Sequence, residues 1–112
     1  KTDDLRRVFN SALDHAMMEP NGCEFNMDLE GSYINMGDMK ILTMPAELFS
    51  KFGLEIKEAM NVSCPIFWGY SNYSVGYLYN KEEAGKSFES ASTNIPVGVP
   101  EKITEMCVKL VK

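Results

Sequence analysis

The stretch that decides the fold is Met39-Lys40-Ile41-Leu42-Thr43-Met44-Pro45-Ala46-Glu47-Leu48. Its first six residues are almost continuously apolar, which predicts a buried strand over residues 39–44. Pro45 then opens a helix, because the first helical position tolerates a proline that lacks an N–H group. Apolar residues at steps of four extend that helix to about residues 46–60; they are Leu48, Phe52, Ile56 and Met60. A buried strand that leads straight into an amphipathic helix is typical of a layered α/β arrangement.

The residues before this stretch predict one helix and two short strands. Thr2-Asp3-Asp4 has the form of a helix start, with a hydroxyl cap followed by acids, and the apolar spacing predicts a helix at about residues 3–17. Residues 24–29 alternate between polar and apolar side chains, which indicates a half-buried strand. After a turn at residues 30–32, residues 33–36 form a second predicted strand.

The residues after this stretch predict more strands, a long loop and a final helix. Residues 64–70 have the apolar character of a buried strand, and residues 74–78 predict another short strand or an extended loop. Residues 80–98 are rich in loop-forming residues. Pro100 starts the last predicted helix, whose apolar stripe consists of Ile103, Met106, Cys107, Leu110 and Val111.

This order of elements predicts an α/β or α+β fold, a small mixed sheet with three helices packed on it. Residues 1–112 suit a single domain or a domain fragment. Several strands are apolar on both faces, which is typical of strands covered on both sides. A chain of this length has few helices for that purpose. We therefore expect it to be part of a larger domain, covered by an upstream part of that domain or by self-association. A start at Lys1 rather than at a methionine also indicates that something upstream was removed.

Composition excludes several classes of partner. The formal net charge of −5 argues against nucleic acid and against anionic membranes as primary partners. No apolar run approaches the roughly 18 residues of a transmembrane segment. The three cysteines are scattered and odd in number, so they predict buried free thiols rather than a disulfide framework; they are Cys23, Cys64 and Cys107.

The residues offer little recognisable catalytic chemistry by themselves. His15 is the only histidine, so the chain cannot build a two-histidine metal site alone. No Ser-His-Asp set with a known spacing, no G-x-S-x-G elbow and no phosphate-binding glycine loop is present. We therefore predict no catalytic residue from the residues alone.

Two features could belong to a binding site. Glu47 follows the carboxyl end of a predicted buried strand, where ligands bind in open α/β sheets. A helix start there would favour the ionised carboxylate that a metal needs, although the same charge could simply complement the helix dipole. Residues 70–77 are rich in tyrosine and small residues. Such a stretch can line a binding cleft or form ordinary turns with aromatic packing.

Several motifs in consistent order resemble the neutral/alkaline non-lysosomal ceramidase family. Residues 39–48 are similar to its strand–P-x-E-L–helix element, and Gly53 matches a glycine six residues after the glutamate. Residues 69–78, GYSNYSVGYL, are similar to the family's G-x-x-N-x-x-x-G-Y segment. Glu82-Glu83, Phe88-Glu89 and Ala91-Ser92-Thr93 resemble the run that follows. The resemblance covers roughly residues 33–112.

The resemblance implies a single zinc ion held by two histidines, a glutamate and a tyrosine. It puts the glutamate on Glu47 and the tyrosine on Tyr77, and it implies substrate contacts at Asn72 and Phe88. In the family, zinc polarises an amide carbonyl and activates a water molecule to split the acyl amide of ceramide. The implied substrate is a lipid or small-molecule amide, and the implied cofactor is zinc in the parent protein.

The departures from the family pattern are equally specific. Both family histidines lie in upstream parts that this chain does not contain. Phe88 stands where the family has a tyrosine that hydrogen-bonds the scissile carbonyl, so that contact is lost. Leu54-Glu55 replaces a pair of arginines. These differences indicate a remote member whose substrate need not be ceramide.

Two hypotheses follow. The chain is a fragment of a zinc-dependent amide hydrolase, inactive when isolated because two ligands are missing. Alternatively, it is a non-catalytic scaffold or binding module that kept the fold and self-associates.

Overall fold

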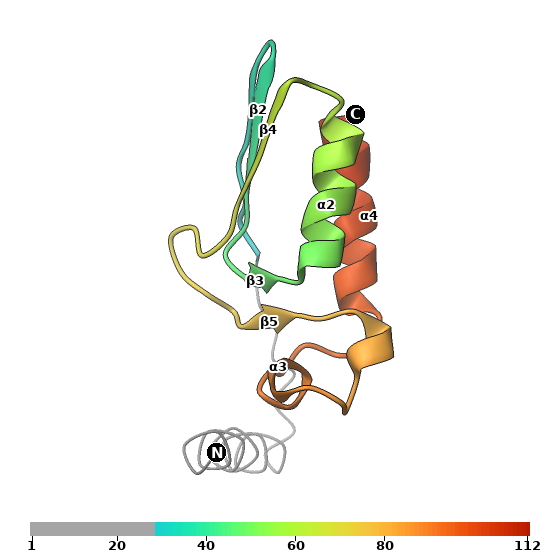
Figure 1. The fold of residues 1–112 in the computed structure, drawn as a ribbon. Coiled ribbons are helices and arrows are strands. Elements are labelled where there is room, and N and C mark those ends of the chain that lie inside the picture. Colours follow the sequence, from blue (N-terminus) through green and yellow to red (C-terminus); the bar gives the residue numbers. More distant parts are fainter. Residues whose placement is uncertain (1–28) are drawn as a thin grey trace.

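The computed structural model describes residues 29–112 as a mixed α/β fold (Figure 1). The predicted helix at about residues 3–17, the predicted strand at residues 24–29, His15 and Cys23 lie outside the described residues. The described elements are, in order, β1 Tyr33–Met36, β2 Met39–Thr43, β3 Glu47–Leu48, α2 Ser50–Met60, β4 Cys64–Trp68, β5 Tyr77–Leu78, the 3-10 helix η2 Lys81–Glu83, α3 Phe88–Ala91 and α4 Val99–Val111.

The main sheet has three strands in the order β1-β2-β4. β1 runs antiparallel to β2 through a tight turn, and β2 runs parallel to β4. A parallel pair needs a crossover connection, and here α2 lies between β2 and β4 in the chain. The predicted small mixed sheet is therefore confirmed.

Both long helices lie on the same side of this sheet (Figure 1). Leu42 of β2 is 2% exposed and belongs to the core between sheet and helices. Lys40 points to the same side, where its ammonium group donates to the last carbonyls of two helices, Met60 O at 2.8 Å and Val111 O at 3.2 Å. Carbonyls at helix C-termini lack intrahelical partners and carry partial negative charge, so a lysine there joins both helix ends to the sheet.

The opposite side of the sheet is apolar and lacks a described helix. Side chains alternate along a strand, so the neighbours of Lys40 and Leu42 in β2 point away from α2 and α4. The strand register places eight uncharged residues on this outer face: Ile34, Met36, Met39, Ile41, Thr43, Cys64, Ile66 and Trp68. Met36 and Trp68 are 54% and 63% exposed. The predicted two-sided apolar character of the strands is thus present, with cover on one side among the described residues.

A second, two-stranded sheet corrects the predicted start of the first long helix. That helix begins at Ser50, not at residue 46, because residues 47–48 form β3 and pair in parallel with β5. The amide of Glu47 donates to Gly76 O at 3.0 Å, and the amide of Phe49 donates to Leu78 O at 3.1 Å. The segment around β5 therefore provides carbonyl acceptors for amides that would have had no intrahelical partner at a helix start. The predicted end of the helix at residue 60 is confirmed.

The final helix α4 begins at Val99, one residue before its predicted start, but its predicted apolar stripe is partly wrong. Met106 and Leu110 are 70% and 57% exposed, while Thr104 is 2% exposed. The Thr104 hydroxyl donates to Pro100 O at 2.9 Å, so this small polar side chain is buried without an unpaired hydroxyl. The core consists of Leu42, Met44, Ala46, Ile56, Met60, Leu78, Ile95, Cys107 and Val111.

The prediction of buried thiols holds for one of the two described cysteines. Cys107 is buried in the core, and desolvation raises the pKa of its thiol. Cys64 is exposed on the outer face of β4, so the prediction was wrong there. Within residues 29–112, no helix has both the length and the apolar character needed to cross a bilayer.

Candidate functional site

The pairing of β3 with β5 brings together the two residues that the family resemblance assigns to a metal. Glu47 and Tyr77, thirty positions apart in the chain, are direct Cα partners in this parallel pair. Direct partners in a sheet project their side chains to the same side and lie close enough to interact. Both residues are half-buried. Glu47 follows the carboxyl end of β2, as predicted, but it is the first residue of β3 and does not lie in the first turn of a helix.

Tyr70 adds a third side chain that the sequence analysis did not assign to the site. Its hydroxyl donates a hydrogen bond to Oε2 of Glu47, across 23 positions of the chain. This bond, desolvation and the nearby negative charge of Glu47 together raise the pKa of Tyr70 to about 12, and Tyr77 adds a smaller effect. The phenol therefore stays protonated at neutral pH and remains a hydrogen-bond donor.

The loop that carries Tyr70 leaves β4 in an unusual conformation. Tyr70 and Asn72 have positive φ angles of 55° and 69°, a region that side chains other than glycine rarely adopt. Asn72 is exposed in this loop, and its predicted contact with substrate stays a prediction. The predicted strand over residues 64–70 ends at Trp68, because the left-handed turn at Tyr70 cannot continue a strand.

Phe88 lies against Tyr77. The two rings meet edge to face, with centroids 6.3 Å apart and planes inclined by 77°. Phe88 is the first residue of α3, a short helix inside the predicted loop region. It begins there because Ser87 and Ser90 form a reciprocal capping box. Phe88 thus restricts the position of the Tyr77 ring on one side. Its predicted contact with substrate stays untested.

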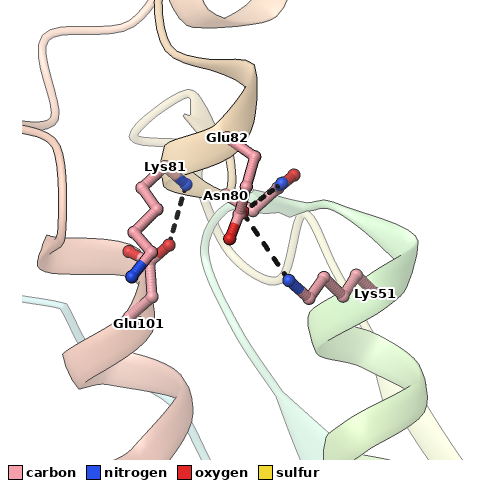
Figure 2. Close-up of polar contacts among 5 residues, drawn as sticks. All are labelled: Lys51, Asn80, Lys81, Glu82 and Glu101. Atoms are coloured by element: carbon pink, nitrogen blue, oxygen red, sulfur yellow. Dashed lines mark hydrogen bonds and ion pairs between the residues drawn. The ribbon is translucent and has the colours of Figure 1, made fainter.

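A polar network fixes the chain immediately after β5 (Figure 2). The amide of Lys81 donates to Oε1 of Glu101 in the first turn of α4, at 2.8 Å. The side-chain amide of Asn80 donates to Oε2 of Glu82 at 2.7 Å, and the same oxygen lies 3.6 Å from Nζ of Lys51 in α2. η2 is therefore connected to both long helices, which sets the position of the strand that carries Tyr77.

Glu82 is the most perturbed carboxyl of this network. The hydrogen bond from Asn80 is the largest effect, followed by a hydrogen bond from its own backbone amide and the charges of Lys51 and Lys81. Together they lower the pKa of Glu82 to about 2. The side chain is half exposed to solvent, so this charge contributes little to stability.

The donor atoms of the site are oxygens, namely the Glu47 carboxylate and the phenols of Tyr70 and Tyr77. A carboxylate oxygen is an ordinary zinc ligand, and a bound metal can lower the pKa of a phenol enough to ionise it. The chemistry of Glu47 and Tyr77 is therefore compatible with a zinc site, in which four ligands are usual. Among residues 29–112, no three His, Cys, Asp or Glu side chains gather in one place, so a complete site needs ligands from elsewhere.

Tyr70 is a residue near Glu47 that the sequence did not identify. The tyrosine-rich segment at residues 70–77 was compatible with a binding cleft or with ordinary turns, and composition does not distinguish its three tyrosines. Only the return of the loop to β3 singles out Tyr70. Its amide donates to Ala46 O at 3.3 Å, beside Glu47.

Comparison of the chain with family models, curated proteins and solved structures found no match.

Proposed function

We propose that this chain is part of a zinc-dependent amide hydrolase and supplies Glu47 and Tyr77 as two of the metal's four ligands. The observation that carries the proposal is the parallel register of β3 and β5, which makes these two residues direct neighbours. The sequence has one histidine, so the two histidines implied by the resemblance belong to a part of the protein outside these residues.

The chemistry of the site is consistent with this role. Glu47 provides a negative charge, and Tyr77 provides an oxygen that becomes a stronger ligand when it ionises. When bound, zinc would polarise an amide carbonyl and activate water. The proposed substrate class is an N-acyl amide of a lipid or a small molecule. Phe88 cannot donate a hydrogen bond to such a carbonyl, so its contribution is to pack against Tyr77.

Calorimetric titration of zinc into the 112-residue chain tests the metal assignment. With two of four ligands, the wild-type chain is expected to bind zinc weakly, and Glu47→Ala is expected to remove this binding. Tyr77→Phe keeps the ring contact with Phe88 and removes only the ligand oxygen, so it is expected to weaken binding. Glu105→Ala, a change at an exposed carboxylate of α4, is the control and should behave like wild type. Equal zinc affinity in wild type and Glu47→Ala would contradict the proposal.

A second candidate function is favoured by the outer face of the sheet. Its eight uncharged residues, most of them apolar, occupy neighbouring positions across β1, β2 and β4. Single exposed apolar residues are common on proteins, but contiguous apolar patches indicate contact with a partner. An identical copy carries the same net charge of −5, and contact through an uncharged surface such as this one brings no like charges together. As this alternative, we propose a module that self-associates through the outer face.

The same substitution on two faces tests this alternative. Met36→Lys places a charge on the outer face, whereas Met106→Lys places it on exposed α4. Light scattering over a range of concentrations should show association of wild type and of Met106→Lys, and a monomer for Met36→Lys. A wild-type chain that stays monomeric at high concentration would exclude the self-associating module.

A further inference from the structure

The hydrogen bond between Tyr70 and Glu47 points to a task for Tyr70 that no motif assigned. We infer that Tyr70 is a positioning residue, whose hydroxyl holds Oε2 of Glu47 and thereby presents Oε1 to a metal ion. The inference rests on the proposed function of Glu47 as a metal ligand. It adds a supporting residue to that site.

Hydrogen bonds and close packing fix the backbone around Tyr70. The amide of Tyr70 donates to Ala46 O at 3.3 Å and that of Ser71 donates to Met44 O at 3.1 Å, so the loop runs back along the segment before β3. At Gly69 a Cβ atom would lie 3.0 Å from Ala46 O, which shows how closely the two segments approach. The left-handed conformation of Tyr70 then directs its side chain to Glu47.

Glu47 is held from the opposite side by β5. Its amide donates to Gly76 O, and its strand partner Tyr77 is itself restrained by Phe88 and by Thr93, whose hydroxyl donates to Tyr77 O at 2.9 Å. The backbone of Glu47 is thus fixed, but the side chain has further rotatable bonds that β3 does not control. Tyr70 is the described side chain that hydrogen-bonds to its carboxylate. Carboxylates that bind metals are commonly held by such outer hydrogen bonds, and losing one typically weakens metal binding about 10–100-fold.

The test is a titration of the 112-residue chain with Co²⁺ as a stand-in for zinc, followed by NMR at the amides of Glu47 and Tyr77. Tyr70→Phe removes the hydroxyl and keeps the ring, and it is expected to raise the dissociation constant about 10–100-fold. Tyr73→Phe is the matched control, because it removes a hydroxyl from the same loop, one that accepts a bond from the amide of Glu30. This control is expected to bind Co²⁺ like wild type.

A second readout does not depend on a metal. The ¹³Cδ resonance of Glu47 in the metal-free chain is expected to shift in Tyr70→Phe and to stay unchanged in Tyr73→Phe. The inference is overturned if that resonance does not move. It is also overturned if Tyr70→Phe binds Co²⁺ like wild type while Glu47→Ala does not bind, and in that case the proposed function survives. If Glu47→Ala and wild type are alike, or if wild type does not bind, the proposed function fails and the inference falls with it.

Discussion

Compared with the packed body formed by α2, α4 and the inner side of the main sheet, the end of the molecule around β3 and β5 has a more irregular backbone and more exposed side chains. In the body, Ile56, Met60 and Val111 are each completely buried. At the β3–β5 end, Tyr70 is 59% exposed and two residues adopt left-handed conformations that only glycine adopts without cost. The body therefore has the features of a stabilising core. The β3–β5 end has the irregular backbone that is common at ligand sites.

The largest expected effect lies in the body. Ile56→Ala removes a fully buried side chain from α2 and is expected to lower the free energy of unfolding by about 2–5 kcal/mol. Leu54→Ala, on the same helix but 66% exposed, should change it by about 0.5 kcal/mol or less. Urea denaturation followed by circular dichroism measures both. Equal effects of the two substitutions would show that α2 does not pack on the sheet as described.

A smaller effect is expected at Lys40, which connects the C-terminal ends of both long helices to β2. Lys40→Met keeps most of the aliphatic stem and removes the ammonium group that donates to Met60 O and Val111 O. Hydrogen bonds to a charged group contribute about 1.5–3 kcal/mol, so unfolding should become easier by an amount of that order. Lys51→Met is the comparison, because its exposed ion pair with Glu82 contributes little to stability. In thermal unfolding, the melting temperature of Lys40→Met should be clearly lower than that of Lys51→Met.

The smallest effect concerns the network beside β5 and depends on pH. The pKa of Glu82 is about 2 in the folded chain, below its ordinary value of 4.5, so its stabilising contribution is present above about pH 4.5. That contribution is lost as the pH falls from about 4.5 to 2. Glu82→Gln should therefore have a slightly lower melting temperature than wild type at pH 6, and the difference should disappear near pH 2. A difference that grows on acidification would have the wrong sign.

The sequence predicted the body of the fold well, because its elements carry strong periodic signals. The apolar run at residues 39–44 and the four-residue spacing from Phe52 to Met60 correspond to β2 and to the buried face of α2. The start of α2 was wrong because Pro45 is compatible with both a helix start and a turn. What decides between them is β5, thirty residues away, and local sequence does not report such a pairing. Likewise, the predicted apolar stripe placed Met106 in the core, whereas the buried face of α4 contains Thr104 and Met106 is exposed.

The site was predictable only in part. Residues 47 and 77 came from motif resemblance, and their closeness depends on the register of β3 with β5. Phe88 was expected near the site, and the structure places it against Tyr77. Tyr70 could not be separated from Tyr73 by composition, since a left-handed turn determines which of the two hydroxyls reaches Glu47.

The most direct test of the central claim, that Glu47 and Tyr77 form one metal site, is paramagnetic mapping with Co²⁺. Bound Co²⁺ broadens the amide signals nearest to it. If Glu47 and Tyr77 share one metal ion, the amide signals of residues 46–48 and 76–78 will lose intensity together, at the same low concentration of metal. Broadening confined to exposed acidic positions, such as Glu82 in η2 or Glu105 in α4, would contradict the claim.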